Sequence, residues 1–319
     1  MKARIVMLLA INAVCAAASY NVGFEVKGNL RVMSFNIRYI NSEDTGARHW
    51  KKRLPLIVQM ITQFKPDVIG LQEAKKSQIV DLEKALSKQY AWFGKQRVAN
   101  ILANEEYNPI FYNVKTVELL SHNTYGLSKD LKIGAKLVRS KEPRIVKVGK
   151  LEVKMGEKAE YALARIFTVG TFKIKSSGKQ FTYINTHLDH KSNEIRTEQM
   201  NYLIGYLKSN SSLLSKPLFL GGDFNTATPF SELTALGMHD TRNAARIKTA
   251  VQGTFTNWNA HELPIEQAQQ MGSLIDFILY NQKGSIEQYA IVQRVVQKGG
   301  KQVEEIMSDH RPVFIDVQL

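Results

Sequence analysis

The chain has 319 residues, 44% of them hydrophobic, which suits one large globular domain or two small ones. Its 43 Lys and Arg residues outnumber its 29 Asp and Glu residues, so the formal net charge is +14. This excess favours anionic partners such as nucleic acid, lipid head groups or phosphorylated metabolites, and charge alone does not choose among them.

Residues 1–19 have the pattern of a secretory signal peptide. Two basic residues precede an apolar run at 5–18, which is too short for a membrane span and ends in small residues that suit signal peptidase. We expect cleavage to leave 20–319 as a secreted or periplasmic domain; an uncleaved N-terminal anchor is the alternative. Because the only cysteine, Cys15, lies in this segment, cleavage would exclude disulfides, thiolate metal sites and cysteine nucleophiles.

Strand and helix patterns follow one another along the rest of the chain. Alternating or continuous apolar runs predict strands, and apolar residues three or four apart predict amphipathic helices. The predicted strands are 30–36, 67–72, 108–112, 162–175, 181–188, one beginning at 218, 274–280 and 312–317. The predicted helices are 50–64, one with Ile79, Leu82 and Leu86 on one side, and one capped by Ser192 or Asn193 with a stripe of Met200, Leu203, Ile204 and Leu207.

Neighbouring strand patterns also indicate antiparallel pairs. The strands predicted at 162–175 and 181–188 flank a Ser-Ser-Gly turn, whereas other strands alternate with helices. This mixture predicts an α/β fold with mixed sheets and helices outside them. The sequence shows no internal repeat, low-complexity tract or linker, so we expect a single domain.

A basic stretch interrupts this pattern at 129–158. It holds ten Lys or Arg residues against four acidic ones. Two interpretations remain open: a solvated loop or exposed hairpin, and an electrostatic collar for an anionic substrate. Only Tyr161 lies close by as a stacking aromatic, which argues against a single-strand binding platform.

Polar residues recur where the predicted strands end. Charged groups are rare at such positions unless they are paired or bind something. The residues are Asn36, Glu73, His187, Asp223, Asn225, Asp309 and His310, with Asp276 inside a strand. Carboxylates without cysteine suit a hard cation such as Mg²⁺, histidines suit proton transfer or binding of developing negative charge, and amides can donate to phosphoryl oxygens. Together these groups are the parts that hydrolysis of a phosphate ester needs.

Taken singly, each of these residues also has a structural interpretation. Glu73 would be a surface acid, Asn36 a turn former and Asp276 a capping residue. Six ordered motifs decide between the two interpretations. They are Ser-Phe-Asn-Ile-Arg (34–38), Leu-Gln-Glu (71–73), Asn-Thr-His-Leu-Asp-His (185–190), Gly-Gly-Asp-Phe-Asn (221–225), Ile-Asp-Phe-Ile (275–278) and Ser-Asp-His-Arg-Pro-Val (308–313). In this order they resemble the motifs of the endonuclease/exonuclease/phosphatase superfamily, over residues 30–318.

The resemblance implies a DNase I-like fold, an α/β four-layer sandwich of two packed mixed β-sheets flanked by helices. It also implies a metal site in which Glu73 is the principal ligand, with Asn36 beside it and Asp309 nearby. The expected cofactor is Mg²⁺, with Mn²⁺ as an alternative.

The resemblance also assigns roles at the scissile phosphate. His310, oriented by Asp276, would act as base or stabilise the charged transition state. Asp223 would orient or deprotonate the attacking water. Asn225 and His187 would hold the phosphoryl oxygens.

Some residues near the motifs stay open or depart from the family pattern. Asp189, His190, Tyr112 and Arg165 are either site residues or packing and loop residues, whereas Trp50 and Arg53 match a Trp-x-x-Arg pattern that we interpret as structural. Many relatives have a basic residue before the Ile-Asp pair, where this chain has Ser273 and Leu274.

We expect a divalent-metal-dependent phosphoric ester hydrolase, foremost a secreted phosphodiesterase acting as a nuclease. A phosphatase or phospholipase C-type enzyme acting on a phospholipid or a small phosphorylated metabolite is the alternative, followed by a non-catalytic anion-binding protein. The expected partner is an anionic phosphate ester, nucleic acid included. We expect a monomer without a membrane span after cleavage.

Overall fold

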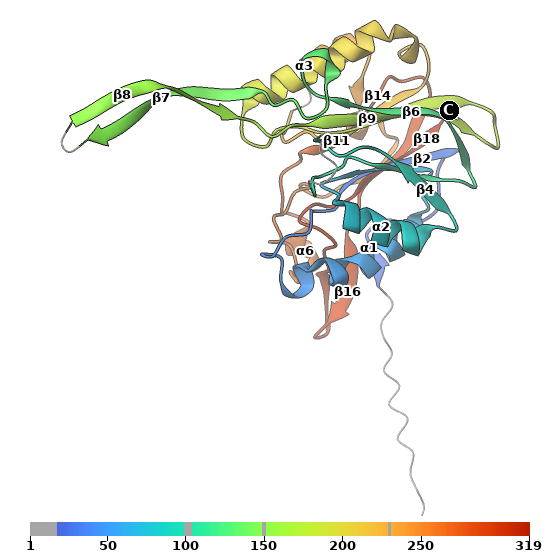
Figure 1. Ribbon diagram of the computed structural model, residues 1–319. Helices are drawn as coiled ribbons and strands as arrows, with labels where there is room; N and C mark the ends of the chain where they lie inside the picture. The colour runs from blue at the N-terminus through green and yellow to red at the C-terminus, as the bar shows by residue number, and fades with distance from the viewer. Residues whose placement is uncertain (1–17, 99–103, 149–150, 229–230) are drawn as a thin grey trace, which may run out of the picture.

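Two mixed β-sheets form the centre of the molecule. A computed structural model describes residues 18–98, 104–148, 151–228 and 231–319 (Figure 1). The seven-stranded sheet has the order β13 (Ile247–Thr249), β15 (Ser285–Ile291), β18 (Val313–Gln318), β2 (Leu30–Asn36), β3 (Val68–Gln72), β5 (Ile110–Asn113) and β4 (Tyr90–Phe93). The six-stranded sheet has the order β12 (His239–Asp240), β14 (Asp276–Tyr280), β11 (Leu218–Asp223), β10 (Gln180–His187), β9 (Ile166–Ile174) and β6 (Val117–Gly126).

Each sheet combines parallel and antiparallel pairs. In the first sheet, β2 runs parallel to β3 and antiparallel to β18. In the second, β10 runs parallel to β11, which is antiparallel to β14. The mixed sheets expected from the sequence are therefore confirmed.

The helices cover the outer faces of the two sheets, so the fold has four layers. Helices α1 (Trp50–Phe64) and α2 (Lys76–Leu86) pack on the seven-stranded sheet, and α3 (Asn193–Ser209) packs on the six-stranded sheet (Figure 1). Shorter helical segments are η1 (Gly46–Arg48), η2 (Lys129–Leu131), η3 (Ser211–Leu213), α4 (Ser231–Ala235), α5 (Thr241–Ala244) and α6 (Ile265–Ala268). This is the four-layer sandwich that the resemblance implied.

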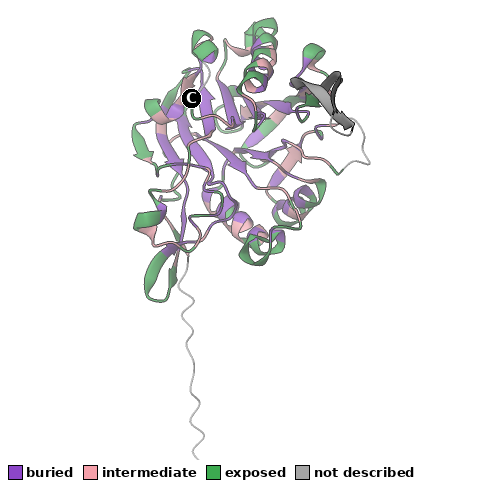
Figure 2. Cartoon of the chain, turned by 90° about the vertical axis from the view of Figure 1, so that its left-hand side faces the viewer, coloured by how far each residue is buried: buried purple, intermediate pink, exposed green. Residues whose placement is uncertain are grey.

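Three apolar clusters hold the layers together. The cluster between the sheets includes Leu30, Phe172, Phe181, Phe219 and Ile315, all buried. The helical stripes predicted from the sequence fill the two outer clusters, one under α1 and α2 and one under α3. Figure 2 shows the central strands of the sandwich largely buried and the outer faces of the helices exposed. Removal of this apolar surface from water is the main force that fixes the layers.

Two smaller sheets lie outside the sandwich. Strands β1 (Ser19–Tyr20), β16 (Arg294–Lys298) and β17 (Lys301–Glu304) form one of them. Strands β7 (Val138–Val148) and β8 (Leu151–Tyr161) pair only with each other and extend away from the body of the molecule (Figure 1). The basic stretch thus forms largely a two-stranded hairpin, which was one form considered in the first of its two interpretations.

Several strand boundaries differ from the sequence predictions. The strand predicted at 162–175 begins only at Ile166, because 162–165 leaves the ladder. The strand predicted at 274–280 begins at Asp276, so this residue opens the strand and does not lie inside it. Asp276 pairs with Asp223 at the end of the β11 and β14 ladder, where polar groups meet and the apolar run starts only afterwards. Within the described ranges, no helix is long and apolar enough to cross a membrane.

Candidate active site

Strand polarity brings the polar strand ends to one edge of the two sheets. Asn36 ends β2 and Glu73 follows the parallel strand β3. His187 ends β10, Asp223 ends the parallel strand β11, and Asp276 begins the antiparallel strand β14. The segment with Asp309 and His310 precedes β18, which is antiparallel to β2 and therefore starts at the same edge.

A cavity of about 730 Å³ opens at this edge. Six of the eight residues predicted from the sequence line it: Glu73, His187, Asp223, Asn225, Asp309 and His310. The other two, Asn36 and Asp276, are buried and hydrogen-bonded to residues of the lining. The structure thus brings all eight residues together at one site.

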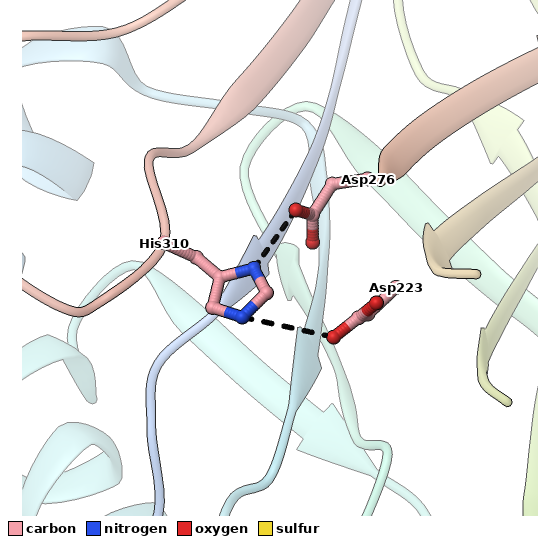
Figure 3. Close-up of side chains that lie close together, drawn as sticks. All are labelled: Asp223, Asp276 and His310. Atoms are coloured by element: carbon pink, nitrogen blue, oxygen red, sulfur yellow. Dashed lines mark hydrogen bonds and ion pairs between the residues drawn. The ribbon is translucent and has the colours of Figure 1, made fainter. Parts of the chain in front are cut away.

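His310 lies between two aspartates (Figure 3). Its Nδ1 is 2.8 Å from Asp276 Oδ2, and its Nε2 is 3.7 Å from Asp223 Oδ2. Burial alone would lower the pKa of His310, but the neighbouring carboxylates, Asp276 above all, outweigh it and raise the pKa to about 10. His310 is therefore an imidazolium at neutral pH, with Nδ1–H donated to Asp276 and Nε2–H directed toward Asp223.

Asp223 is a buried carboxylate that titrates near neutral pH. Burial and the adjacent Asp276 carboxylate raise its pKa to about 7, against the opposing effect of His310. Its Oδ2 accepts a hydrogen bond from Asn36 Nδ2 at 3.0 Å, and its Oδ1 accepts one from the backbone N–H of Asn225 at 2.9 Å. These two bonds fix the plane of the carboxylate while it can still gain or lose a proton.

Glu73 and Asp309 form an acidic pair on the other side of Asn36. Glu73 Oε1 accepts from Asn36 Nδ2 at 3.1 Å, and Oε2 accepts from the Tyr39 N–H at 3.2 Å. Burial raises the pKa of Glu73, and the Glu106 and Asp309 carboxylates raise it further. Arg38 Nη1 is 3.7 Å from Asp309 Oδ2, so this guanidinium offsets only part of the negative charge.

The donor atoms fit a divalent cation. Asp223, Asp276 and His310 have ligand atoms within 4.8 Å of one another, although His310 is engaged by both aspartates. Asn36, Glu73 and Asp309 offer oxygen atoms only, which is the preference of hard cations such as Mg²⁺. Because Glu73 is half-buried beside other carboxylates, a cation would neutralise negative charge that Arg38 offsets only in part.

Arg165 fixes the protonation state of His187. Arg165 Nη1 lies 2.9 Å from His187 Nδ1, and a guanidinium has only donors, so Nδ1 must accept and the proton must be on Nε2. Burial lowers the pKa of His187 well below its usual value, and the Arg165 charge lowers it further. His187 is therefore a neutral imidazole, and its protonated Nε2 lies 3.5 Å from Asp223 Oδ2.

Two donors meet at the floor of the cavity. Asn225 Nδ2 lies 3.1 Å from His187 Nε2 and donates to the Leu188 carbonyl at 3.2 Å. Since His187 Nε2 carries a proton, neither nitrogen can accept from the other. An anionic oxygen at this point would accept from both.

The residues left open by the sequence divide into two groups. Arg165 and His190 line the cavity. Asp189 is buried and caps the following turn through Oδ1, which accepts from the N–H groups of Lys191 and Ser192. Tyr112 packs against the cluster between the sheets.

Arg53 has the structural role that its motif suggested. It is fully buried and donates to the carbonyls of Ile37, Arg38, Arg48 and Met307. These bonds join the segment after β2 to the segment before Asp309. Arg53 thereby fixes the distance between the segment after β2 and the segment before Asp309, and it does not line the cavity itself.

The cavity wall also contains charged residues that the sequence did not single out, among them Arg97, Glu105 and Glu106. They lie outside all six motifs. The only signal in the sequence was the pair of consecutive acids before the strand predicted at 108–112, and such a pair is more often a solvated turn.

Comparison with known proteins gives a family match over most of the chain. The model of the Endonuclease/Exonuclease/phosphatase family matches residues 18–310. No curated protein matches the chain.

Solved structures with the same fold come from several organisms. A mannosyl-6-phosphatase of Bacteroides thetaiotaomicron VPI-5482 has 24% identity and a TM-score of 0.72, with 91% of this chain and 100% of that chain covered. An endonuclease/exonuclease/phosphatase of Bacteroides vulgatus has 28% identity and a TM-score of 0.69, with 91% and 98% covered. D. rerio TDP2, complexed with single-strand DNA product, has 15% identity and a TM-score of 0.59, with 91% and 99% covered. At 24% and 15% identity, the first and third similarities show the fold alone.

Proposed function

Since the chain belongs to the endonuclease/exonuclease/phosphatase family and is a phosphoric ester hydrolase, we propose that it hydrolyses a small, soluble phosphate ester with the help of bound Mg²⁺. One observation carries the choice of a small substrate. The polar residues lie in a cavity of about 730 Å³. Cavities of roughly 300–1,000 Å³ are typical of small-molecule sites.

The proposed metal ligands are Glu73, Asn36 and Asp309. A divalent cation bound there would polarise a phosphoryl oxygen and neutralise charge as the transition state forms. Asn36 has a second role, because its Nδ2 donates to both Glu73 and Asp223. These two bonds fix the position of the proposed metal ligand Glu73 relative to Asp223, which would activate the water. Mn²⁺ is the alternative ion for the same oxygen ligands.

Asp223 is the proposed general base. A pKa of about 7 leaves a large share of the carboxylate ionised at neutral pH and still basic enough to accept a proton from water. The protonated His310, held by Asp276, then donates toward the developing negative charge. His187 and Asn225 supply the two neutral donors for the phosphoryl oxygens.

A nuclease is the second candidate, favoured by the net charge of +14 and by the β7–β8 hairpin beside the cavity. Arg139 and Tyr161, at the base of that hairpin, line the cavity. A polynucleotide could follow this side of the molecule with one phosphate in the site.

Substrate assays separate the two functions. The purified 20–319 protein is incubated with p-nitrophenyl phosphate, a panel of small phosphate monoesters, plasmid, single-stranded DNA and RNA, each with Mg²⁺, Mn²⁺ or chelator. We expect chelator-sensitive phosphate release from small esters, absent in a His310→Asn variant. Chelator-sensitive cleavage of nucleic acid alone would replace the proposal with the nuclease.

We also propose that the protein acts outside the cytoplasm, after removal of residues 1–19. The charge and apolar pattern of this segment supports the proposal.

A further inference from the structure

A continuous series of charged side chains runs from His187 to the outer wall of the cavity. Arg165 Nη1, which donates to His187, is 3.9 Å from Glu106 Oε2. Glu106 Oε2 also accepts from Arg97 Nη1 at 2.9 Å, and Arg97 Nη2 is 2.7 Å from Glu105 Oε2. Arg165, Glu106, Arg97 and Glu105 all line the cavity, and we call these four residues the paired wall.

The paired wall has no net charge, since its two guanidinium groups are matched by two carboxylates. A surface that binds a polyanion needs basic groups whose charge is free to meet phosphates, and carboxylates beside them would repel each phosphate. The wall is therefore a poor surface for nucleic acid, although the whole chain is strongly basic. Its position beside His187 makes it the surface next to the group esterified to the phosphate.

Alternating donors and acceptors suit hydroxyl groups. A hydroxyl both donates and accepts, a guanidinium offers five N–H donors, and a carboxylate offers about four acceptor sites on two oxygens. Arg97 binds Glu105 and Glu106 through Oε2 in each case. Adjacent donors and acceptors of this kind match neighbouring hydroxyls on one carbon chain or ring.

The cavity lining also includes an apolar surface. Tyr161 is 56% exposed and Leu163 is 38% exposed, and both line the cavity. Next to them, Arg139 is paired with Glu160 at 2.6 Å and with Asp189 at 3.4 Å, so this guanidinium is neutralised as well. An aromatic side chain and a polar wall in one cavity suit a ring that has hydroxyls at its edge and C–H groups on its face.

We propose that the paired wall is a subsite for the hydroxyl groups of the leaving alcohol, so that the substrate is a phosphorylated sugar or polyol. This inference rests on the proposed function and adds the substrate class. The phosphate occupies the site at Asp223 and His310, and the hydroxyls bind Glu105, Glu106 and Arg97.

The test compares substrates that share the phosphate and differ in hydroxyls. Steady-state kinetics with Mg²⁺ are measured for a hexose 6-phosphate and for p-nitrophenyl phosphate, which lacks hydroxyls, on the 20–319 protein and on Arg97→Gln and Glu105→Gln variants. We expect the ratio of the two kcat/KM values, hexose phosphate over p-nitrophenyl phosphate, to fall at least tenfold in each variant, since hydrogen bonds to charged groups are lost. The Glu287→Gln variant is the matched control, because Glu287 forms an Arg–Glu pair with Arg246 outside the cavity lining.

Each other result overturns the subsite. Equal losses for both substrates would show that the wall only supports the fold, and circular dichroism and melting temperature of the near-isosteric Glu105→Gln variant would detect such a defect. Hydrolysis of p-nitrophenyl phosphate without any sugar or polyol phosphate would refute the substrate class and leave the proposed function standing. Chelator-sensitive cleavage of nucleic acid without release from any small ester would refute both.

Discussion

Replacing Asp276 by Asn should change the pH dependence of catalysis. Asp276 is fully buried and is the main cause of the raised pKa of His310. From 6.5 to about 10 is 3.5 units, or about 5 kcal/mol in favour of the charged imidazolium. Without the Asp276 carboxylate, burial lowers the pKa of His310 and only the smaller effects of Asp223 and Asp309 oppose it. With a variant pKa of about 6.5, about 3% of His310 is protonated at pH 8, so the kcat at pH 8 should fall roughly thirtyfold.

The decisive measurement is the ratio of wild-type to variant kcat between pH 6 and pH 9. Because most His310 side chains would again be protonated at pH 6 if the variant pKa were 6.5, the ratio should shrink as the pH falls. A ratio that stays constant over this range would refute the assignment of His310 as a charged donor. The Glu287→Gln variant, altered outside the cavity, should follow the wild-type profile throughout.

Three further predictions follow from the same geometry. Glu73→Gln should remove the rise in melting temperature that Mg²⁺ gives the wild type, as measured by thermal shift; an equal rise in the variant would exclude Glu73 as a ligand. In the presence of chelator, the raised pKa values of Asp223 and His310 stabilise the fold at low pH, and this contribution is lost as the pH rises through about 7 and then about 10. The free energy of unfolding, measured with denaturant, should therefore fall from pH 6 to pH 10. A constant or rising free energy of unfolding over this range would contradict the prediction. The intact mass of the protein recovered outside the cytoplasm should correspond to a chain that begins at Tyr20. A mass that corresponds to a chain beginning at Met1 would exclude cleavage.

The grouping of the motif residues at one edge of each sheet could be predicted, because the sequence indicates the relative direction of the strands. Asn36 and Glu73 come at the ends of two apolar runs separated by a helix, and such a unit places its strands parallel, with both ends at one edge. His187 and Asp223 repeat this arrangement across α3 in the second sheet. The sequence could not predict that these edges of the two sheets lie against each other. The packing of the apolar cluster between the sheets determines this arrangement.

The paired wall could not be predicted, because its contacts depend on segments without regular structure. Glu105 and Glu106 lie in a loop, and Arg165 lies at 162–165, where alternation predicted a strand that does not form.

Backbone conformation shows what the site costs the free protein. Arg38, Glu73 and Asn225 all have left-handed backbone, with φ of 54°, 60° and 50°. For residues other than glycine, such conformations cost on the order of 1 kcal/mol or more each and persist only where the surroundings enforce them.

The carboxylates beside Glu73 and the close approach of two donors, His187 Nε2 and Asn225 Nδ2, add to this cost. A cation at Glu73 and a phosphoryl oxygen at His187 would relieve these two costs and leave the backbone unchanged. The folded protein therefore already holds the backbone conformations of the site before any ligand binds. A cation and an anion should each bind more tightly when the other is present.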